Sequence, residues 1–209
     1  MKYDIKKITS SEGQSFDNMF KIYADSLPIS EQKNRDGIAS IVDRDDYYVF
    51  GLYNASILLG FSILFMADNQ SIALLEYMAT SVKWRNMGIG ANIFRFNTKI
   101  VGDRPMLVEV DSDRELAKDH AIRVRRKNFY RRLGCRQLEG IFYLLPLSGE
   151  ERTPVMDLLL YANKPKKCVR LSTVQSWLET IYVSVYGQQK DDVRIEEMLA
   201  NAPDPVPII

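Results

Sequence analysis

The chain has 209 residues, with 28 lysines and arginines against 27 aspartates and glutamates and a net charge of +1. This length allows one good hydrophobic core with a small appendage and excludes two full catalytic domains. The near-zero charge gives no overall attraction to nucleic acid or an anionic membrane, so we expect neither as a partner. The hydrophobic share of 46% excludes disordered and fibrous classes.

The cysteine and histidine content argues against metal-binding and secreted proteins. Cys135 and Cys168 lack the spacing of metal ligands, and His120 cannot complete a structural zinc site with them. The first ten residues do not resemble a signal peptide, and the longest apolar runs, such as residues 57–67, are too short to span a bilayer. We therefore expect a cytoplasmic protein that uses no metal.

The first half of the chain alternates the two hydrophobic periods that distinguish strands from helices. Period-two alternation predicts strands, and apolar residues three or four positions apart predict helices. The expected elements are a strand at 3–8, a helix capped by Ser15, a polar helix at about 30–42, a hairpin of strands at 47–53 and 57–66, and a strand at 71–80.

The second half continues this mixture, which predicts an α/β fold with a mixed central sheet of about seven strands flanked by helices. The expected elements are a helix at about 90–100, a strand at 106–110, a basic helix at 120–133 that ends at Gly134, and strands at 138–145 and 155–161.

The C-terminal region is predicted to be an extension of the main domain. A lysine-rich segment with Pro165 indicates a linker, and apolar residues from Leu171 to Val185 at helical spacing indicate an amphipathic helix. We expect that helix to pack either on the domain or on a second copy of the chain, so a homodimer is one possible assembly. Three prolines after residue 201 predict a loose tail. We therefore divide the chain into a domain at 1–163, a linker and helical extension at 164–200, and a flexible tail at 201–209.

A glycine-containing turn lies between the strand at 71–80 and the next helix. It reads Arg85-Asn86-Met87-Gly88-Ile89-Gly90 and leads into Ala91. A strand, such a turn and a helix in this order present backbone N–H groups around one concavity, which can bind phosphate. The pattern is neither a P-loop nor the dinucleotide-binding fingerprint, and by itself it is equally typical of a tight turn.

Two segments together resemble the GCN5-related N-acetyltransferase (GNAT) superfamily. The first runs from Leu75 through Met78, Ala79 and Thr80 into the glycine turn. The second, Asn128-Phe129-Tyr130-Arg131-Arg132-Leu133-Gly134-Cys135, resembles the family's NxxFYxxxGF segment, with Cys135 where phenylalanine is usual. The resemblance covers residues 1–163, and it indicates a bacterial branch without an assigned substrate.

The resemblance implies an acyltransferase that uses acetyl-CoA or another acyl-CoA. The main chain of Met78, Ala79 and Thr80 would pair with pantetheine, and the N–H groups from Arg85 to Ala91 would hold the pyrophosphate with help from the Arg85 side chain. Asn128 resembles the position that contacts the pantetheine arm. The binding residues so implied are Met78, Ala79, Thr80, Arg85, Asn86, Met87, Gly88, Ile89, Gly90, Ala91 and Asn128.

Acyl transfer to an amine needs a neutral nucleophile, a donor for the oxyanion and a proton for the leaving thiolate. By resemblance Tyr130 supplies that proton, and the N–H of Ala79 or Thr80 polarises the carbonyl. Strand alternation places Glu76 on the face of Met78, which makes it the candidate base, directly or through water. The alternatives are a buried packing role for Tyr130 and a salt bridge for Glu76. Glu109 and Asp111 are reserve bases.

Other interpretations remain open at this stage. The preferred acceptor is the primary amine of a small molecule; a protein or carrier-bound acceptor is the alternative, with the polar segment 25–46 as part of its groove. A non-catalytic acyl-CoA sensor would keep the pocket without turnover. The basic helix is expected to be mostly solvated, with some of its charges available to the 3'-phosphate of CoA, and a nucleic-acid binder is the weakest option.

Overall fold

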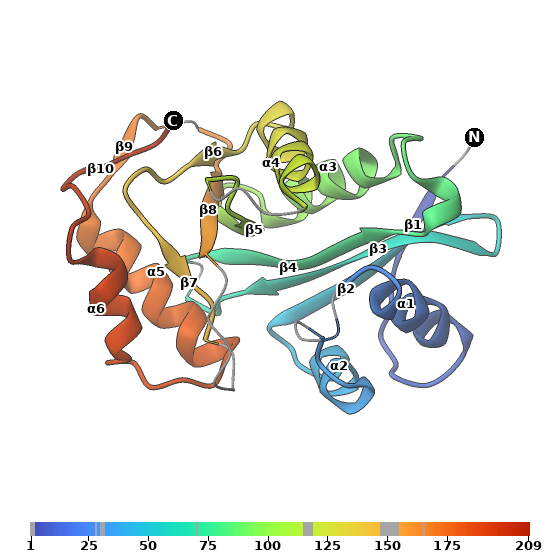
Figure 1. Cartoon of the computed structure of the whole chain (residues 1–209). Coiled ribbons are helices and arrows are strands. Elements are labelled where there is room, and N and C mark those ends of the chain that lie inside the picture. Colours follow the sequence, from blue (N-terminus) through green and yellow to red (C-terminus); the bar gives the residue numbers. More distant parts are fainter. Residues whose placement is uncertain are drawn as a thin grey trace. The chain divides into compact units, whose positions relative to one another are not determined.

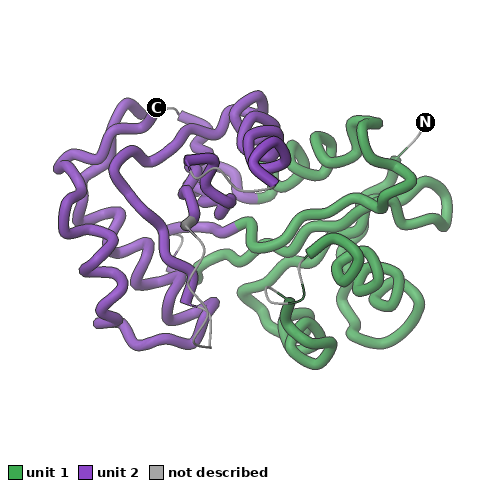
Figure 2. The backbone as a smooth tube through the Cα atoms, in the orientation of Figure 1, with its two compact units in different colours: residues 1–68, 75–100 green, residues 69–74, 101–209 purple. Residues whose placement is uncertain are grey.

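The computed structural model describes residues 3–27, 29, 32–69, 71–114, 119–146, 155–164 and 166–209. The chain divides into two compact units, one formed by residues 1–68 and 75–100 and the other by 69–74 and 101–209 (Figure 2). The strand order is β1-β2-β3-β4-β5-β8-β6, with β7 also paired to β8. Strand β4, Ala73–Thr80, begins in the second unit and continues in the first. The boundary predicted at residue 163 does not coincide with this division.

The first unit is built on antiparallel strands and a predicted hairpin. Strands β2, Tyr47–Asn54, and β3, Ile57–Met66, pair in antiparallel register, and β1, Asp4–Lys7, pairs with the other edge of β2. Ala55 takes a positive φ of 53° in the turn of the hairpin. These strands agree with the sequence prediction to within a few residues.

Helices cover both faces of these strands in the first unit (Figure 1). Helices α1, Gln14–Ala24, and α2, Arg35–Val42, lie on one face, and α3, Ile89–Val101, lies on the other. Two predicted helix starts were wrong. Ser15 lies inside α1 and does not cap it, and α2 begins at Arg35 because the Asn34 side chain accepts a hydrogen bond from the Gly37 amide. Part of the segment predicted to begin this helix, residues 30–31, lies outside the described residues.

A hydrophobic cluster fixes the start of α3 against the strands. Leu52 and Leu59 pack there with Ile89 and Ile93, and the half-buried Met78 and Trp84 add to the cluster. The apolar spacing in the first turns of α3 therefore determines where the preceding glycine turn emerges. Trp84 thus packs against the start of α3.

The second unit contains the remaining strands and the basic helix. Strand β5, Met106–Asp111, pairs antiparallel with β8, Val155–Tyr161, and the short strands β6, Arg136–Gln137, and β7, Tyr143–Leu144, pair with β8. Helix α4, His120–Arg132, ends before Gly134, whose φ of 100° confirms the predicted left-handed stop. The strand predicted at 138–145 is wrong, because Gly140, with a φ of 82°, turns the chain between two short strands.

The C-terminal region folds back on the second unit. Helix α5, Leu171–Ser184, buries Val174, Leu178 and Ile181 as predicted, and a second helix, α6, Val193–Leu199, contacts it. The tail is not loose: β10, Val206–Pro207, pairs with β9, Cys168–Val169, and the Gln137 amide donates to the Ile209 carbonyl at 2.8 Å. The three prolines led to the wrong prediction of a loose tail. The backbone carbonyls and the remaining amides of the tail still form hydrogen bonds with neighbouring segments.

No helix within the described ranges is both long and apolar enough to cross a bilayer.

Candidate active site

The glycine turn lies exposed at the start of α3. Residues 85–88 are exposed, whereas Ile89 is buried in the cluster that anchors the helix. Asn86 and Gly88 both take positive φ values, 65° and 77°. A left-handed conformation suits glycine and asparagine best, which explains why this sequence turns here.

The turn keeps its amides available. The first hydrogen bond of α3 runs from the Asn92 amide to the Gly88 carbonyl at 3.1 Å. Within the part of the chain that the structure describes, the amides from Met87 to Ala91 donate no hydrogen bond. A Cβ built on Gly88 would meet nothing within 4 Å, so the space over the turn is open. Free amides, open space and a helix N-terminus fit a phosphate group.

The second half of β4 is more exposed than the first. Ala73 to Leu75 are buried, whereas every residue from Glu76 to Thr80 is half-buried. The Glu76 side chain is only 2% exposed, so the exposed part of this residue is its backbone. An accessible strand backbone is what pairing with a pantetheine amide requires.

Glu76 is engaged through both carboxylate oxygens. Oε1 contacts the Lys33 ammonium at 2.5 Å, and Oε2 accepts a hydrogen bond from the Tyr47 hydroxyl at 2.8 Å. Burial, followed by the charge of Glu76, raises the pKa of the Tyr47 phenol, so this group remains a donor. Each oxygen of the Glu76 carboxylate therefore already has one partner.

The predicted shared face of Glu76 and Met78 is not borne out. Met78 packs with Ile89 and Ile93 of α3. The Lys33 ammonium that pairs with Glu76 lies 5.8 Å from the Tyr77 ring centroid, and Tyr77 contacts Tyr23 of α1 edge-on. Glu76 therefore points to the face covered by α1 and α2.

Tyr130 lies near the end of α4 in the second unit. Its side chain is buried, the Phe129 ring meets it edge-on at 5.1 Å between centroids, and its carbonyl accepts from the Leu133 and Cys135 amides. Burial raises the pKa of the Tyr130 phenol, which keeps it protonated at neutral pH. Asn128, two residues earlier, is exposed.

Cys135 occupies a buried position immediately after the α4 stop. It is fully buried, and burial raises the pKa of its thiol to about 12. A buried, protonated cysteine behaves as a small apolar side chain. The departure from phenylalanine therefore preserves an apolar contact at this position.

The reserve bases are also occupied. Glu109 accepts hydrogen bonds from the Tyr143 and Tyr186 hydroxyls, the latter at 2.6 Å, and Asp111 pairs with Arg126. Tyr186 follows α5, so the C-terminal region reaches this carboxylate. A role for Glu109 as base stays a prediction, as it does for Asp111.

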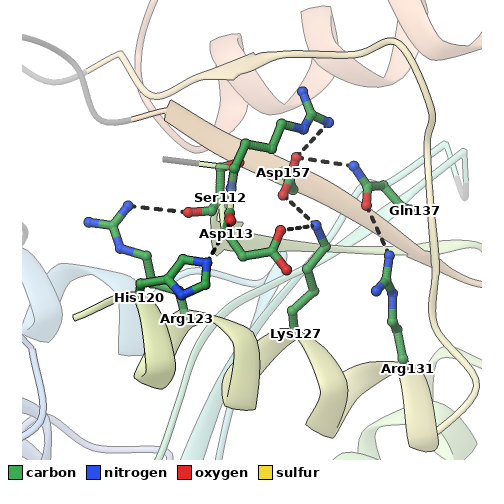
Figure 3. A network of polar contacts seen from close by, with 9 residues as sticks. Ser112, Asp113, His120, Arg123, Lys127, Arg131, Gln137 and Asp157 are labelled. Carbon is green, nitrogen blue, oxygen red and sulfur yellow. Dashed lines mark hydrogen bonds and ion pairs between the residues drawn. The ribbon is translucent and has the colours of Figure 1, made fainter. Parts of the chain in front are cut away.

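A buried ion network in the second unit was not predicted (Figure 3). The Lys127 ammonium contacts Asp157 at 2.7 Å and Asp113 at 2.6 Å, and Arg114 and Gln137 also bind Asp157. The basic helix is thus not wholly solvated, because Lys127 is buried. The available signal was Asp157, a lone charge within the apolar strand at 155–161.

Two hollows lie beside these elements, one in each unit. In the first unit a cavity of about 590 Å³ is bounded by residues 81–84, which lead into the glycine turn, and by α1. In the second unit a groove of about 1030 Å³ runs past Trp177, Lys164 and Ile208 and contains no predicted site residue. Volume alone therefore does not locate the site that the motifs predict.

The predicted site residues fall into two sets. Glu76, Met78 to Thr80 and the turn belong to the first unit, whereas Asn128 and Tyr130 belong to the second. Within the first set, β4 and the turn are close in the sequence, and the cluster of Met78 with Ile89 and Ile93 holds them together in the structure. That the two sets act together stays a prediction. Among the described residues no group of side chains could hold a metal ion.

Comparison with known proteins finds solved structures with a similar fold. No protein-family model matches this sequence, and no curated protein sequence matches it significantly. A Bacteroides thetaiotaomicron protein described as a GNAT-family acetyltransferase superposes with a TM-score of 0.73 at 22% identity, over 89% of this chain and 99% of that one. The ribosomal-protein-S18-alanine N-acetyltransferase from Escherichia coli gives 0.56 at 15% identity, over 79% and 96%. An aminoglycoside 6'-N-acetyltransferase complexed with coenzyme A gives 0.61 at 14%, over 78% and 98%.

Proposed function

From the GNAT fold that this chain shares with those acetyltransferases, we propose that it transfers an acetyl group from acetyl-CoA to the primary amine of a small molecule. The observation that carries the proposal is the turn at residues 85–91, in which the amides from Met87 to Ala91 donate no hydrogen bond within the described chain and the space over Gly88 is open. A turn whose amides already had partners would have no means of holding a pyrophosphate.

The chain's own groups supply binding first. The amides from Met87 to Ala91 would bind the pyrophosphate, with the exposed Arg85 as a charged donor. The backbone of the half-buried residues Met78, Ala79 and Thr80 would pair with the pantetheine arm, and the Ala79 or Thr80 amide would polarise the thioester carbonyl. Acetyl-CoA, when bound, supplies the activated acyl group.

Proton transfer then completes the reaction. The amine nitrogen forms a bond to the thioester carbon, the carbon–sulfur bond breaks, and Tyr130 donates a proton to the departing sulfur. The amine loses its own proton to Glu76, directly or through water. Burial raises the pKa of Tyr130, so its phenol carries the proton that this step needs, although it holds that proton more tightly than a free phenol does. The contacts of Glu76 with Lys33 and Tyr47 mean that its role requires Lys33 to move.

The acceptor is the part of the proposal for which alternatives remain. One structural neighbour is named for a ribosomal protein acceptor and another for an aminoglycoside, so the fold accommodates both classes. A homodimer stays a prediction, and α5 gives no support for it because its apolar face is buried within its own unit.

Thiol release from acetyl-CoA, measured over a panel of small amines and lysine peptides, tests the proposal. We expect turnover with at least one small primary amine. Turnover on peptides only would transfer the acceptor role to proteins. Tight CoA binding without turnover on any amine would support a sensor, and absence of CoA binding would refute the proposal.

A further inference from the structure

The contacts around Glu76 form a small cation-binding box. Its walls are the Glu76 carboxylate, the Tyr47 hydroxyl that donates to it, and the Tyr77 ring (Figure 1 shows β2 and β4, which carry them). The present occupant is the Lys33 ammonium, 2.5 Å from the carboxylate and 5.8 Å from the ring centroid. A carboxylate beside an aromatic face is a typical receptor for an ammonium group.

The carboxylate end of this ion pair is buried, and its lysine end is partly exposed. The Glu76 side chain is 2% exposed, whereas the Lys33 side chain is 30% exposed. The neighbouring cation, Arg44, is committed elsewhere, because it makes two hydrogen bonds to Asp46 and stacks on Tyr47. A buried carboxylate demands a cation, and only Lys33 among these groups can leave toward solvent.

The rest of the Lys33 segment is anchored independently of the box. The Lys33 amide donates to the Tyr23 hydroxyl at 2.8 Å, the Gln32 side chain binds the Ala24 and Leu27 carbonyls, and Asn34 caps α2. The backbone therefore stays in place when the lysine side chain rotates away. This arrangement differs from a surface ion pair such as Arg35 with Asp17, where both side chains are about half exposed.

We propose that the Glu76, Tyr47 and Tyr77 box is the binding site for the ammonium form of the acceptor amine, and that Lys33 is its internal occupant until the acceptor displaces it. This inference rests on the proposed function. It narrows the acceptor to aliphatic primary amines, which are cations at neutral pH, and disfavours arylamines, which are not. Lys33 competes for the box, so the apparent affinity for the acceptor is reduced by the fraction of time the lysine occupies it.

Lys33→Ala tests the box directly, because it removes the occupant and leaves room for a small cation. We expect a lower melting temperature for this variant, and n-butylammonium chloride should raise it by about 3 °C more than an equal concentration of sodium chloride does. The double variant Lys33→Ala/Glu76→Gln is the matched control and should show no such difference. Equal responses of the two variants overturn the proposal.

Lys33→Met serves if the alanine variant does not fold, since it keeps the apolar stem without the charge. Thiol-release assays then test the link to the acceptor. Removing Lys33 should lower KM for benzylamine about tenfold and leave KM for aniline unchanged. Stabilisation by n-butylammonium without any change in KM would show a cation site that the acceptor does not use, and it would overturn the assignment.

The two proposals fail separately. If no amine is acetylated by any variant, the proposed function falls while the stabilisation experiment still decides whether the box binds ammonium. If amines are acetylated but Lys33→Ala gains nothing from n-butylammonium, the acetyltransferase proposal stands and the box does not.

Discussion

Two buried carboxylates, Glu76 in the first unit and Asp157 in the second, have lysine partners yet differ in how completely they are enclosed. Asp157 is fully buried and is held by Lys127, Arg114 and Gln137. Its main partner, Lys127, is itself only 4% exposed in its side chain. Glu76 has a partner that is 30% exposed and a single phenol.

We infer from this difference that a buried carboxylate paired with a lysine can either stabilise the fold or form a binding site. The Asp157 network ties α4 to β8 and to the segment after β5 through Lys127, whose side chain is only 4% exposed, while Arg114, at 35% exposed, lies at its edge. The Glu76 pair can open on one side only, through the lysine. The two lysines differ most in their exposure, which is 4% for the Lys127 side chain and 30% for that of Lys33.

Breaking the enclosed network should have the largest effect. Lys127→Met leaves the buried Asp157 without its ammonium partner, and we expect a loss of about 3–5 kcal/mol in the free energy of unfolding. Chemical denaturation measures it. Arg132→Met, an exposed position on the same helix, is the control and should change stability by no more than about 0.5 kcal/mol. Similar losses in the two variants would show that Lys127 is not part of a stabilising network.

Tyr130 lies on α4 with Lys127. We expect a chemical role for Tyr130 and a structural role for Lys127. Tyr130→Phe keeps the buried ring and removes the proposed proton donor, so turnover should fall about 100-fold with little change in CoA affinity. Single-turnover kinetics and calorimetric titration with CoA check the two quantities. Unchanged turnover would assign the proton to another group.

The glycine turn, unlike the two carboxylates, is exposed, and a substitution there tests ligand binding at an open surface. Gly88→Val places a side chain in open space over the free amides, so we expect CoA affinity to fall at least about tenfold. The positive φ also costs about 1–2 kcal/mol of stability. Gly102→Val is the matched control, with a φ of 62° and equally open surroundings, and it should lose stability but not CoA binding. Equal affinity in folded Gly88→Val protein would refute the placement of the phosphate.

The smallest expected effect is a difference in chemical labelling between the two cysteines, which tests only whether each side chain is buried. A pKa of about 12 leaves Cys135 with roughly a thousandfold less thiolate at neutral pH than an ordinary thiol, and the side chain is fully buried. Cys168 is exposed. Iodoacetamide under native conditions should label Cys168 and spare Cys135, as read by peptide mass spectrometry. Comparable labelling would mean that the end of α4 opens readily.

Local periodicity was sufficient for most of the first unit. The hairpin of β2 and β3, the α3 helix and the glycine turn were predicted close to their observed bounds, because strand alternation and helical spacing are properties of short segments. Caps were less predictable: Ser15 has the right chemistry for a helix start, but α1 already begins at Gln14. The C-terminal strand β10 was not predicted, because it forms by pairing with β9, and no local sequence pattern indicates that pairing.

The same limit applies to the candidate site. The turn and Tyr130 were found from motifs, whereas the partners of Glu76 come from segments 43 and 29 residues away in sequence. Lys33 lay in a segment predicted to be a polar helix and, for a protein acceptor, part of an acceptor groove, but no contact with Glu76 was predicted for it. The Asp157 network likewise joins residues from α4, β8 and the segment after β5, which no spacing rule connects.

The amino-acid sequence alone was enough for most strands and helices up to residue 133, for the position of the glycine turn, and for the GNAT fold that the comparisons confirm. Only the tertiary structure decided which charges are enclosed and which can leave. Secondary structure follows from neighbours a few residues apart, whereas the state of a carboxylate depends on which distant side chains reach it and on how much water they exclude.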